Sequence, residues 1–154
     1  MILGIAGRNA SGKGEVVAFL EARSFHACSL SDVIREELRA RGEEESRERM
    51  IELGRALRAE EGPDALVRRL LPRLKSDRNI VVDSIRHPAE ALALRQASPR
   101  FRLIWVEADE AIRLARIRKR GRPGDPTTLE RLRELEGREL AGDAPGAQQL
   151  QAVR

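Results

Sequence analysis

The stretch GRNASGKGEV, residues 7–16, has the spacing of a phosphate-binding loop. Gly7, Gly12 and Lys13 occupy fixed positions of the motif Gly-x4-Gly-Lys-Ser/Thr. Glycines in such a loop let consecutive backbone N–H groups turn inward around a phosphate, and the helix that follows adds its positive N-terminal end. The lysine supplies a mobile cation for the β- and γ-phosphates. We therefore predict that this stretch binds nucleotide phosphates.

The position after Lys13 departs from the motif. A Ser or Thr hydroxyl normally stands there and helps to hold Mg²⁺, whereas this chain has Gly14 followed by Glu15. The phosphate cradle itself depends on the glycines, the backbone and the lysine. The departure therefore concerns the metal, for which Glu15 becomes one candidate ligand.

The rest of the chain alternates short apolar runs with helical patterns, which indicates a mostly parallel sheet with helices on both faces. In such sheets, ligands bind at the carboxyl ends of the strands. Polar segments fall at those ends, and we expect them to converge on one site: 7–13, 29–32, 83–86 and 107–109. The predicted strands are 2–6, 25–29, 79–82 and 101–106. The predicted helices with both bounds are 13–22, 47–60, 63–75, 88–96 and 109–119. Ser46 is the expected cap of the 47–60 helix. Two more helices are predicted from their caps, one that follows Ser31 and one that follows Thr127 or Thr128 and ends near 140.

Composition sets the class of protein. A chain of 154 residues with 41% hydrophobic residues suits a single domain, residues 1–154, with its own core. Aromatic residues make up only 3%, which argues against a base-stacking surface and a nucleic-acid partner. Cys28 is the one cysteine, which excludes an internal disulfide. No apolar run reaches the ~20 residues of a membrane span, so we expect a cytoplasmic protein with no membrane partner.

Five features carry a family resemblance: GRNASGKGEV at 7–16, SLSDVIR at 29–35, LGRALR at 53–58, VVDSIR at 81–86, and the spacing of Arg116 and Arg120. Together they resemble adenylate-kinase-like nucleoside monophosphate kinases and small dephospho-CoA-kinase-like P-loop proteins. Those kinases share the Lys-Gly step of the loop, but usually have Thr where this chain has Glu15. The resemblance covers about residues 1–140.

This resemblance implies an α/β, three-layer P-loop kinase fold with a mostly parallel sheet of four or five strands. It implies a helical acceptor-binding region at about 31–75 and a short lid at about 116–127. The nucleotide-binding residues would be Gly7, Asn9, Ala10, Ser11, Gly12, Lys13, Gly14 and Glu15, with Arg116 and Arg120 of the lid. The acceptor-binding residues would be Ser31, Asp32, Arg35, Arg58, Arg86 and Arg122. The composition of the tail, 141–154, leads us to expect that it is partly disordered.

Asp83 ends an apolar strand, where a buried carboxylate needs a partner. We predict that it holds Mg²⁺ through water, with Glu15 as a further candidate. Arg86 follows on the same loop and should point into the same cleft. His87 has no evident role, and a surface or packing position is expected for it.

The run RLARIRKRGR, residues 113–122, contains six basic side chains. Arg116 and Arg120 are four residues apart and therefore share one face of a helix. Arg113 and Lys119 are expected to lie on a solvated face. A basic lid of this kind would neutralise a transferring phosphoryl group and exclude water.

These features predict phosphoryl transfer that depends on ATP and Mg²⁺. The predicted acceptor is a small phosphorylated molecule, with a nucleoside or deoxynucleoside monophosphate as the leading candidate. The catalytic residues would be Lys13, Asp83, Arg116 and Arg120. A phosphate acceptor is already anionic, so positioning and charge suffice without a general base.

Two alternatives stay open. The acceptor could carry a hydroxyl, as in dephospho-CoA kinase, and Asp32 would then take the hydroxyl proton. The chain could also be a nucleotide-binding module without catalysis, since the metal-binding hydroxyl and a fifth strand after the lid are both missing. A truncated chain, or completion of the sheet by a partner in a homodimer, would account for the missing strand.

Overall fold

The computed structural model of the chain describes residues 1–74, 77–121, 125–140, 142 and 146–154. Arg122 and the end of the predicted 63–75 helix therefore lie outside the described residues, as do parts of the predicted lid and tail. The strands are β1 (Ile2–Ala6), β2 (Phe25–Ser29), β3 (Asn79–Asp83) and β4 (Arg102–Trp105). The helices are α1 (Lys13–Glu21), α2 (Leu30–Ala40), α3 (Arg47–Glu61), α4 (Ala65–Leu70), η1 (Leu71–Arg73), α5 (Pro88–Ala97), α6 (Glu110–Arg120), α7 (Leu129–Leu140) and α8 (Leu150–Val153).

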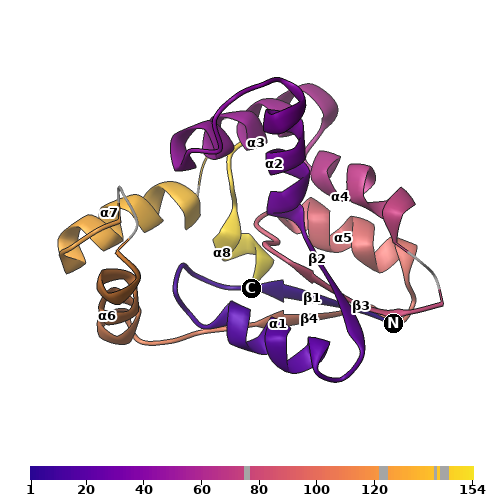
Figure 1. Ribbon diagram of the computed structural model, residues 1–154, viewed down its shortest axis with the longest axis horizontal. Helices are drawn as coiled ribbons and strands as arrows, with labels where there is room; N and C mark the ends of the chain where they lie inside the picture. Colours follow the sequence, from indigo (N-terminus) through magenta and orange to yellow (C-terminus); the bar gives the residue numbers. More distant parts are fainter. Residues whose placement is uncertain (75–76, 122–124, 141, 143–145) are drawn as a thin grey trace.

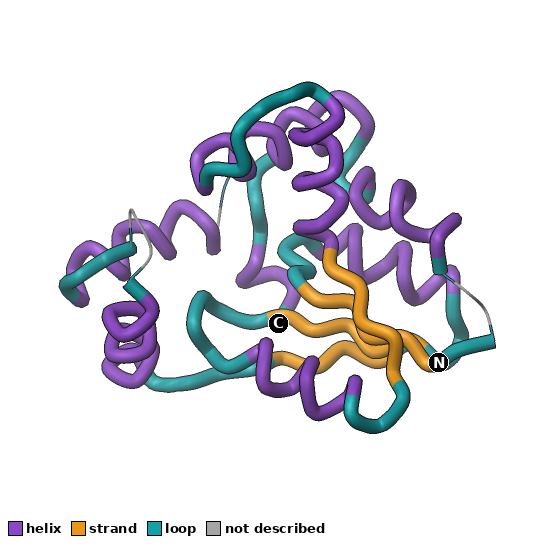
Figure 2. The backbone as a smooth tube through the Cα atoms, in the orientation of Figure 1, coloured by secondary structure: helices purple, strands orange, loops and turns teal. Residues whose placement is uncertain are grey.

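Within the described residues the strands form one four-stranded sheet in the order β2-β3-β1-β4, and every pairing is parallel (Figures 1 and 2). β1 lies between β3 and β4, with Ile2 opposite Ile80 and Leu3 opposite Arg102. Each strand therefore ends at the same edge of the sheet. The prediction of a mostly parallel α/β sheet with four or five strands is confirmed.

The two faces of the sheet are covered by different helices (Figure 1). Ile5 and Val81 pack with Leu20 of α1 on one face. On the other face Ile80 and Val82 join the main core. This alternation follows from the period of two along a strand. Buried leucines and isoleucines of α2, α3, α4 and α5 complete the main core, which is aliphatic as the low aromatic content predicts.

The cap of α2 differs from the prediction by two residues. Ser29, and not Ser31, is the N-cap, because its Oγ accepts a hydrogen bond from the Ser31 N–H. The helix therefore begins directly at the carboxyl end of β2. Ser46 caps α3 as predicted, with its Oγ accepting from the Arg49 N–H. Thr128 accepts from the Arg131 N–H at the start of α7.

The structure adds detail to two predicted segments, the helix at 63–75 and the tail at 141–154. The helix predicted for 63–75 is regular only over α4 and then tightens into η1, which begins at Leu71 next to Pro72. Proline cannot donate a helical hydrogen bond, which accounts for this change. At the other end of the chain, Ala147, Leu150 and Val153 are buried. These three side chains belong to the described part of the tail, and Val153 packs in the main core.

Candidate active site

The carboxyl ends of β1, β2 and β3 open into one cleft with a volume of about 1280 Å³. The predicted residues that line it are Asn9, Ala10, Ser11, Gly12, Lys13, Gly14, Glu15, Ser31, Arg35, Arg58, Asp83, Arg86, Arg116 and Arg120. Gly7 and Asp32 do not line it, and Arg122 is outside the described residues. Residues 107–109 do not line it either. The loop after β1 packs against the end of β4, which keeps this fourth predicted segment away from the cleft.

The backbone of the loop after β1 requires glycine at two positions. Gly7 has φ +143°, and a Cβ there would lie 2.2 Å from the Val106 carbonyl oxygen. Gly12 has φ +107°. Ala10 also adopts a left-handed φ of 58°, although it carries a side chain. Strained backbone of this kind concentrates at ligand-binding sites.

Lys13 and the start of α1 place positive charge inside the curve of the loop. The Lys13 ammonium donates to the Gly7 carbonyl at 3.0 Å and to the Arg8 carbonyl at 2.8 Å. Gly12 is the N-cap of α1, and among the described residues no side chain caps it. The first N–H groups of a helix lack intrahelical partners, so this end of α1 is suited to an anion.

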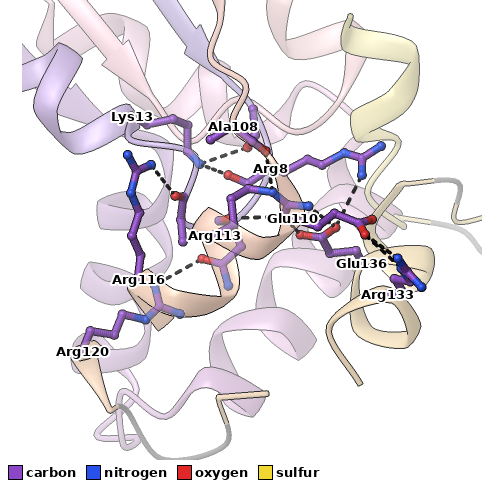
Figure 3. A network of polar contacts seen from close by, with 12 residues as sticks. Arg8, Lys13, Ala108, Glu110, Arg113, Arg116, Arg120, Arg133 and Glu136 are labelled. Carbon is purple, nitrogen blue, oxygen red and sulfur yellow. Dashed lines mark hydrogen bonds and ion pairs between the residues drawn. The ribbon is translucent and has the colours of Figure 1, made fainter. Parts of the chain in front are cut away.

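Arg116 and Arg120 of α6 reach the same loop from outside (Figure 3). Arg116 Nη1 donates to the Ala10 carbonyl at 3.0 Å, and Arg120 Nη1 donates to Asn9 Oδ1 at 3.2 Å. Arg120 also forms a bidentate pair with Asp125, with distances of 2.8 and 2.7 Å. The hydrogen bond to Asp125 raises the pKa of Arg120 further above its usual range. Both predicted lid arginines therefore lie at the phosphate-binding loop.

Asp83 stands at the end of β3 and faces the cleft. Its Oδ2 accepts from Ser84 Oγ at 3.4 Å, whereas its Oδ1 is buried without a hydrogen-bond partner among the described residues. A buried carboxylate oxygen in this condition needs a cation or water, so Asp83 fits the predicted Mg²⁺. Among the described residues there is no cluster of three or more His, Cys, Asp or Glu that could hold a metal. Mg²⁺ often keeps several waters and binds through one or two carboxylates plus substrate phosphates, which matches a lone Asp83.

Glu15, the other candidate for the metal, is exposed in the first turn of α1 and lines the same cleft. Glu44, Glu45 and Glu48 bring further carboxylates to the lining of the cleft. The cleft therefore combines cationic groups around the loop with acidic groups beside the start of α3.

Arg35, one of the predicted acceptor-binding residues, is held by its neighbours on α2. Its Nη1 donates to Ser31 Oγ at 3.1 Å and to Asp32 Oδ1 at 2.5 Å. The Asp32 side chain is 56% exposed. Ser31 and Arg35 thus face the cleft, whereas Asp32 lies at its outer side and holds Arg35.

Arg58 and Arg86 are tied to residues that the sequence reasoning missed. Arg58 is buried and pairs with Glu90 of α5. Arg86 Nη1 donates to Gln148 Oε1 at 3.0 Å, and Gln148 lines the cleft. The Arg58 guanidinium therefore borders the cleft as part of an ion pair.

His87 has a structural role at the start of α5, whereas Arg113 differs from its expectation. His87 is the N-cap of α5, with Nδ1 accepting from the Ala89 N–H at 3.1 Å, and Glu90 completes a capping box. An acid three residues after a cap is a sequence signal that could have found Glu90. Arg113 was expected on a solvated face, but it is only 1% exposed. It pairs with Glu136 of α7, which was also missed.

Comparisons with known proteins identify the family and the fold of this chain. A family model described as "AAA domain" matches residues 3–139. This chain belongs to the AAA domain family. It is 34% identical over 142 residues to a UPF0200 protein of Hyperthermus butylicus, which covers 91% of this chain and 76% of that protein. It is 33% identical over 155 residues to a UPF0200 protein of Methanoregula boonei, covering 99% and 85% of the two chains.

Among solved structures, this family member is similar to an unliganded sugar kinase from Janibacter sp. HTCC2649. The TM-score is 0.54 with 15% identity, over 96% of this chain and 81% of that chain. At this identity the similarity concerns the fold. The family and the fold together make the chain a nucleotide-binding, kinase-like P-loop protein, which confirms the predicted superfamily. In the described part of the chain, no helix is both long and apolar enough to cross a membrane.

Proposed function

We propose that this chain transfers the γ-phosphoryl group of ATP to a small phosphorylated acceptor, with a nucleoside or deoxynucleoside monophosphate as the acceptor class. The observation that carries the proposal is one cleft that joins the loop after β1, Asp83 and the acceptor-side residues Ser31 and Arg35. A cleft lined by both a phosphate-binding loop and a second group of polar residues can hold two molecules side by side, which suits transfer of a group between them.

The donor half is the loop with the arginines of α6. The N–H groups at the start of α1 and the ammonium of Lys13 would bind the β- and γ-phosphates. Arg116 and Arg120 would stabilise the charge that spreads over the phosphoryl oxygens during transfer. Asp83 would hold Mg²⁺ through water, with Glu15 as a second candidate. When bound, the ion neutralises phosphate charge.

The acceptor half is formed by Arg35 and Arg86, with Arg58 at its border. In the reaction an oxygen of the acceptor phosphate forms a bond to the γ-phosphorus of ATP, and the bond to the β,γ-bridging oxygen breaks. The products are ADP and a diphosphorylated acceptor. A phosphate oxygen is already ionised, so this step requires no side chain to remove a proton.

The position of Asp32 supports a phosphate acceptor over a hydroxyl acceptor. A hydroxyl acceptor needs a carboxylate within hydrogen-bond reach of its proton. Asp32 is the carboxylate that the sequence offers for this role, but it does not line the cleft and is engaged with Arg35. Asp32 instead forms an exposed pair with Arg35, which itself lines the cleft.

The proposal is tested by a panel of nucleoside monophosphates, deoxynucleoside monophosphates and dephospho-CoA, each supplied with ATP and Mg²⁺, with ADP release as the readout. We expect turnover with at least one monophosphate and none with dephospho-CoA. Turnover with dephospho-CoA alone would assign the hydroxyl acceptor. ATP binding without turnover on any acceptor would leave a nucleotide-binding module and overturn the proposal.

Lys13→Ala is the matched test of the donor half. We expect turnover to fall by about 10²–10³, the usual cost of one donor to a developing anion. Lys119→Ala removes the same kind of side chain from an exposed position of α6 outside the cleft, and it should leave turnover unchanged. Equal activity of the Lys13 variant and the wild type would show that the loop is not the donor site.

A further inference from the structure

Glu136 of α7 lies between two guanidinium groups behind the phosphate-binding loop (Figure 3). The residue is only 5% exposed. Its Oε1 accepts from Arg113 Nη1, and its Oε2 lies 3.2 Å from Arg113 Nη2 and 3.6 Å from Arg8 Nη1. Arg8 belongs to the loop itself. One carboxylate on α7 therefore binds the loop directly through Arg8 and the neighbouring helix α6 through Arg113.

Arg113 also contacts the loop directly, at Asn9. Its Nη1 donates to the Asn9 carbonyl at 3.4 Å, and its Nε donates to the Ala108 carbonyl at 3.0 Å. The Asn9 carbonyl and the Ala10 N–H belong to one planar trans peptide, in which the two groups point in opposite directions. Arg113 is buried outside the cleft, whereas Ala10 lines it. Holding the Asn9 carbonyl toward Arg113 therefore turns the Ala10 N–H toward the cleft.

The conformation held in this way is one that the loop would not keep by itself. Ala10 has a φ of 58°, which costs free energy for a residue with a side chain. Such a conformation persists only where surrounding contacts impose it. The contacts at this point include those of Arg113 to the Asn9 carbonyl, of Arg116 to the Ala10 carbonyl and of Arg120 to Asn9 Oδ1.

We propose that Glu136 is a positioning residue for the phosphate-binding loop, acting through Arg113 and Arg8. It touches neither nucleotide nor acceptor. Its carboxylate fixes the buried guanidinium of Arg113 and the partly buried guanidinium of Arg8, which in turn hold the peptide planes that present N–H groups to the phosphates. This inference deepens the proposed function, since it takes the loop as the donor nucleotide site.

The same pair of helices offers a matched control. Glu110 of α6 pairs with Arg133 of α7, with Nε of Arg133 2.9 Å from Oε2 of Glu110 (Figure 3). The side chains of this pair are 34% and 61% exposed. Glu110→Gln therefore removes a carboxylate from the contact between α6 and α7 that, among the described residues, forms no hydrogen bond or close ion pair with the loop and reaches Arg8 only through longer-range charge.

The first experiment compares Glu136→Gln, Glu110→Gln and the wild type without ligand, by amide hydrogen exchange of residues 8–13. We expect faster exchange in the loop of the Glu136 variant only. The affinity for a non-hydrolysable ATP analogue should fall about tenfold in that variant, which corresponds to about 1.4 kcal/mol. Unchanged exchange in the loop would overturn the inference, as would exchange that rises equally throughout the molecule.

The second experiment separates positioning from stability. A buried ion pair can often be replaced by apolar residues of similar volume without loss of stability, so the double variant Arg113→Met with Glu136→Leu should unfold near the wild-type temperature. It should still bind the ATP analogue about tenfold more weakly. Wild-type affinity in this double variant would reduce Glu136 to a structural role and refute the inference.

The two proposals fail in different ways. A wild-type protein that binds the analogue but transfers no phosphoryl group refutes the kinase function and leaves the role of Glu136 to be decided by affinity and exchange. A wild-type protein that binds no analogue refutes the donor site, and the exchange of residues 8–13 still decides whether Glu136 orders the loop.

Discussion

Arg58 of α3 and Glu90 of α5 form an ion pair whose side chains are 3% and 0% exposed. Arg58 Nε and Nη2 lie 3.0 and 2.9 Å from Oε1 of Glu90. The other oxygen of Glu90 accepts from the N–H groups of Arg86 and His87 at 2.8 and 3.1 Å. A single carboxylate thus joins α3 to the turn that follows Asp83.

Glu90→Gln is expected to lower the free energy of unfolding by about 3 kcal/mol, because it leaves the Arg58 guanidinium buried without a counter-charge. Urea denaturation measures this change. Glu36→Gln serves as the control, because Glu36 pairs with Arg73 at the surface, where such pairs contribute about 0–1 kcal/mol. If Glu90→Gln lowers the free energy of unfolding by as little as Glu36→Gln does, the buried pair does not stabilise the fold as expected.

Asp83→Asn keeps the shape of the side chain and removes its charge. If Asp83 holds Mg²⁺ through water, the Mg²⁺ concentration that gives half-maximal turnover should rise by about 10- to 100-fold, as for other residues that act through a metal-bound ligand. A Mg²⁺ titration of ADP release checks this. Asp109→Asn, exposed and outside the cleft, should retain the wild-type requirement. The same Mg²⁺ requirement in both variants would exclude Asp83 from the metal site.

Asp32→Asn should change kcat/KM by less than about threefold, because Asp32 lies outside the cleft and its exposed pair with Arg35 is of the kind that contributes little. Arg35→Gln should instead raise the acceptor KM and leave the ATP KM unchanged. Steady-state kinetics with either substrate varied distinguish the two. A loss of more than about 10² for Asp32→Asn would identify it as a general base and favour the hydroxyl acceptor.

His87 makes stability depend on pH. Burial lowers the pKa of His87, and Arg58 adds to this, while Glu90 opposes it. The unfolded chain therefore takes up a proton at His87 before the folded chain does. The stability from this group is complete above the unfolded pKa of about 6.5 and is lost as the pH falls from there through the folded pKa.

The check is the unfolding temperature between pH 7.5 and 5.5. His87→Asn supplies another good cap for α5. On acidification, the unfolding temperature of this variant should fall less than that of the wild type. His26→Asn changes the other histidine, which is exposed, and should follow the wild type. Identical pH dependence in all three proteins would show that His87 is not the titrating group.

Local patterns were enough to predict the parts of the site that the backbone determines. The spacing of Gly7, Gly12 and Lys13 predicts the loop, and the apolar run before Asp83 places this acid at a strand end. The period of two in the strands separates the two faces of the sheet. These features depend on neighbours in the sequence, which a single chain displays directly.

The buried ion pairs depend on packing between distant elements, and local patterns do not show them. Arg113 looks like one more member of a basic run, and only its partner Glu136 on another helix explains its burial. One local signal was available. Arg113 is four residues before Ile117, which is fully buried, so the two share one face of α6.

The order of strands in the sheet also determines when the loop takes shape as the chain is made. β1 carries the loop, yet its partners are distant in sequence, since Ile2 pairs with Ile80 and Leu3 with Arg102. β2, the next strand to be synthesised, pairs with β3 and not with β1. Contacts over such separations form slowly. Among the described residues, β1 therefore gains its two sheet partners only once residues 79–105 are available, and the loop gains its contact with the Val106 carbonyl only after them.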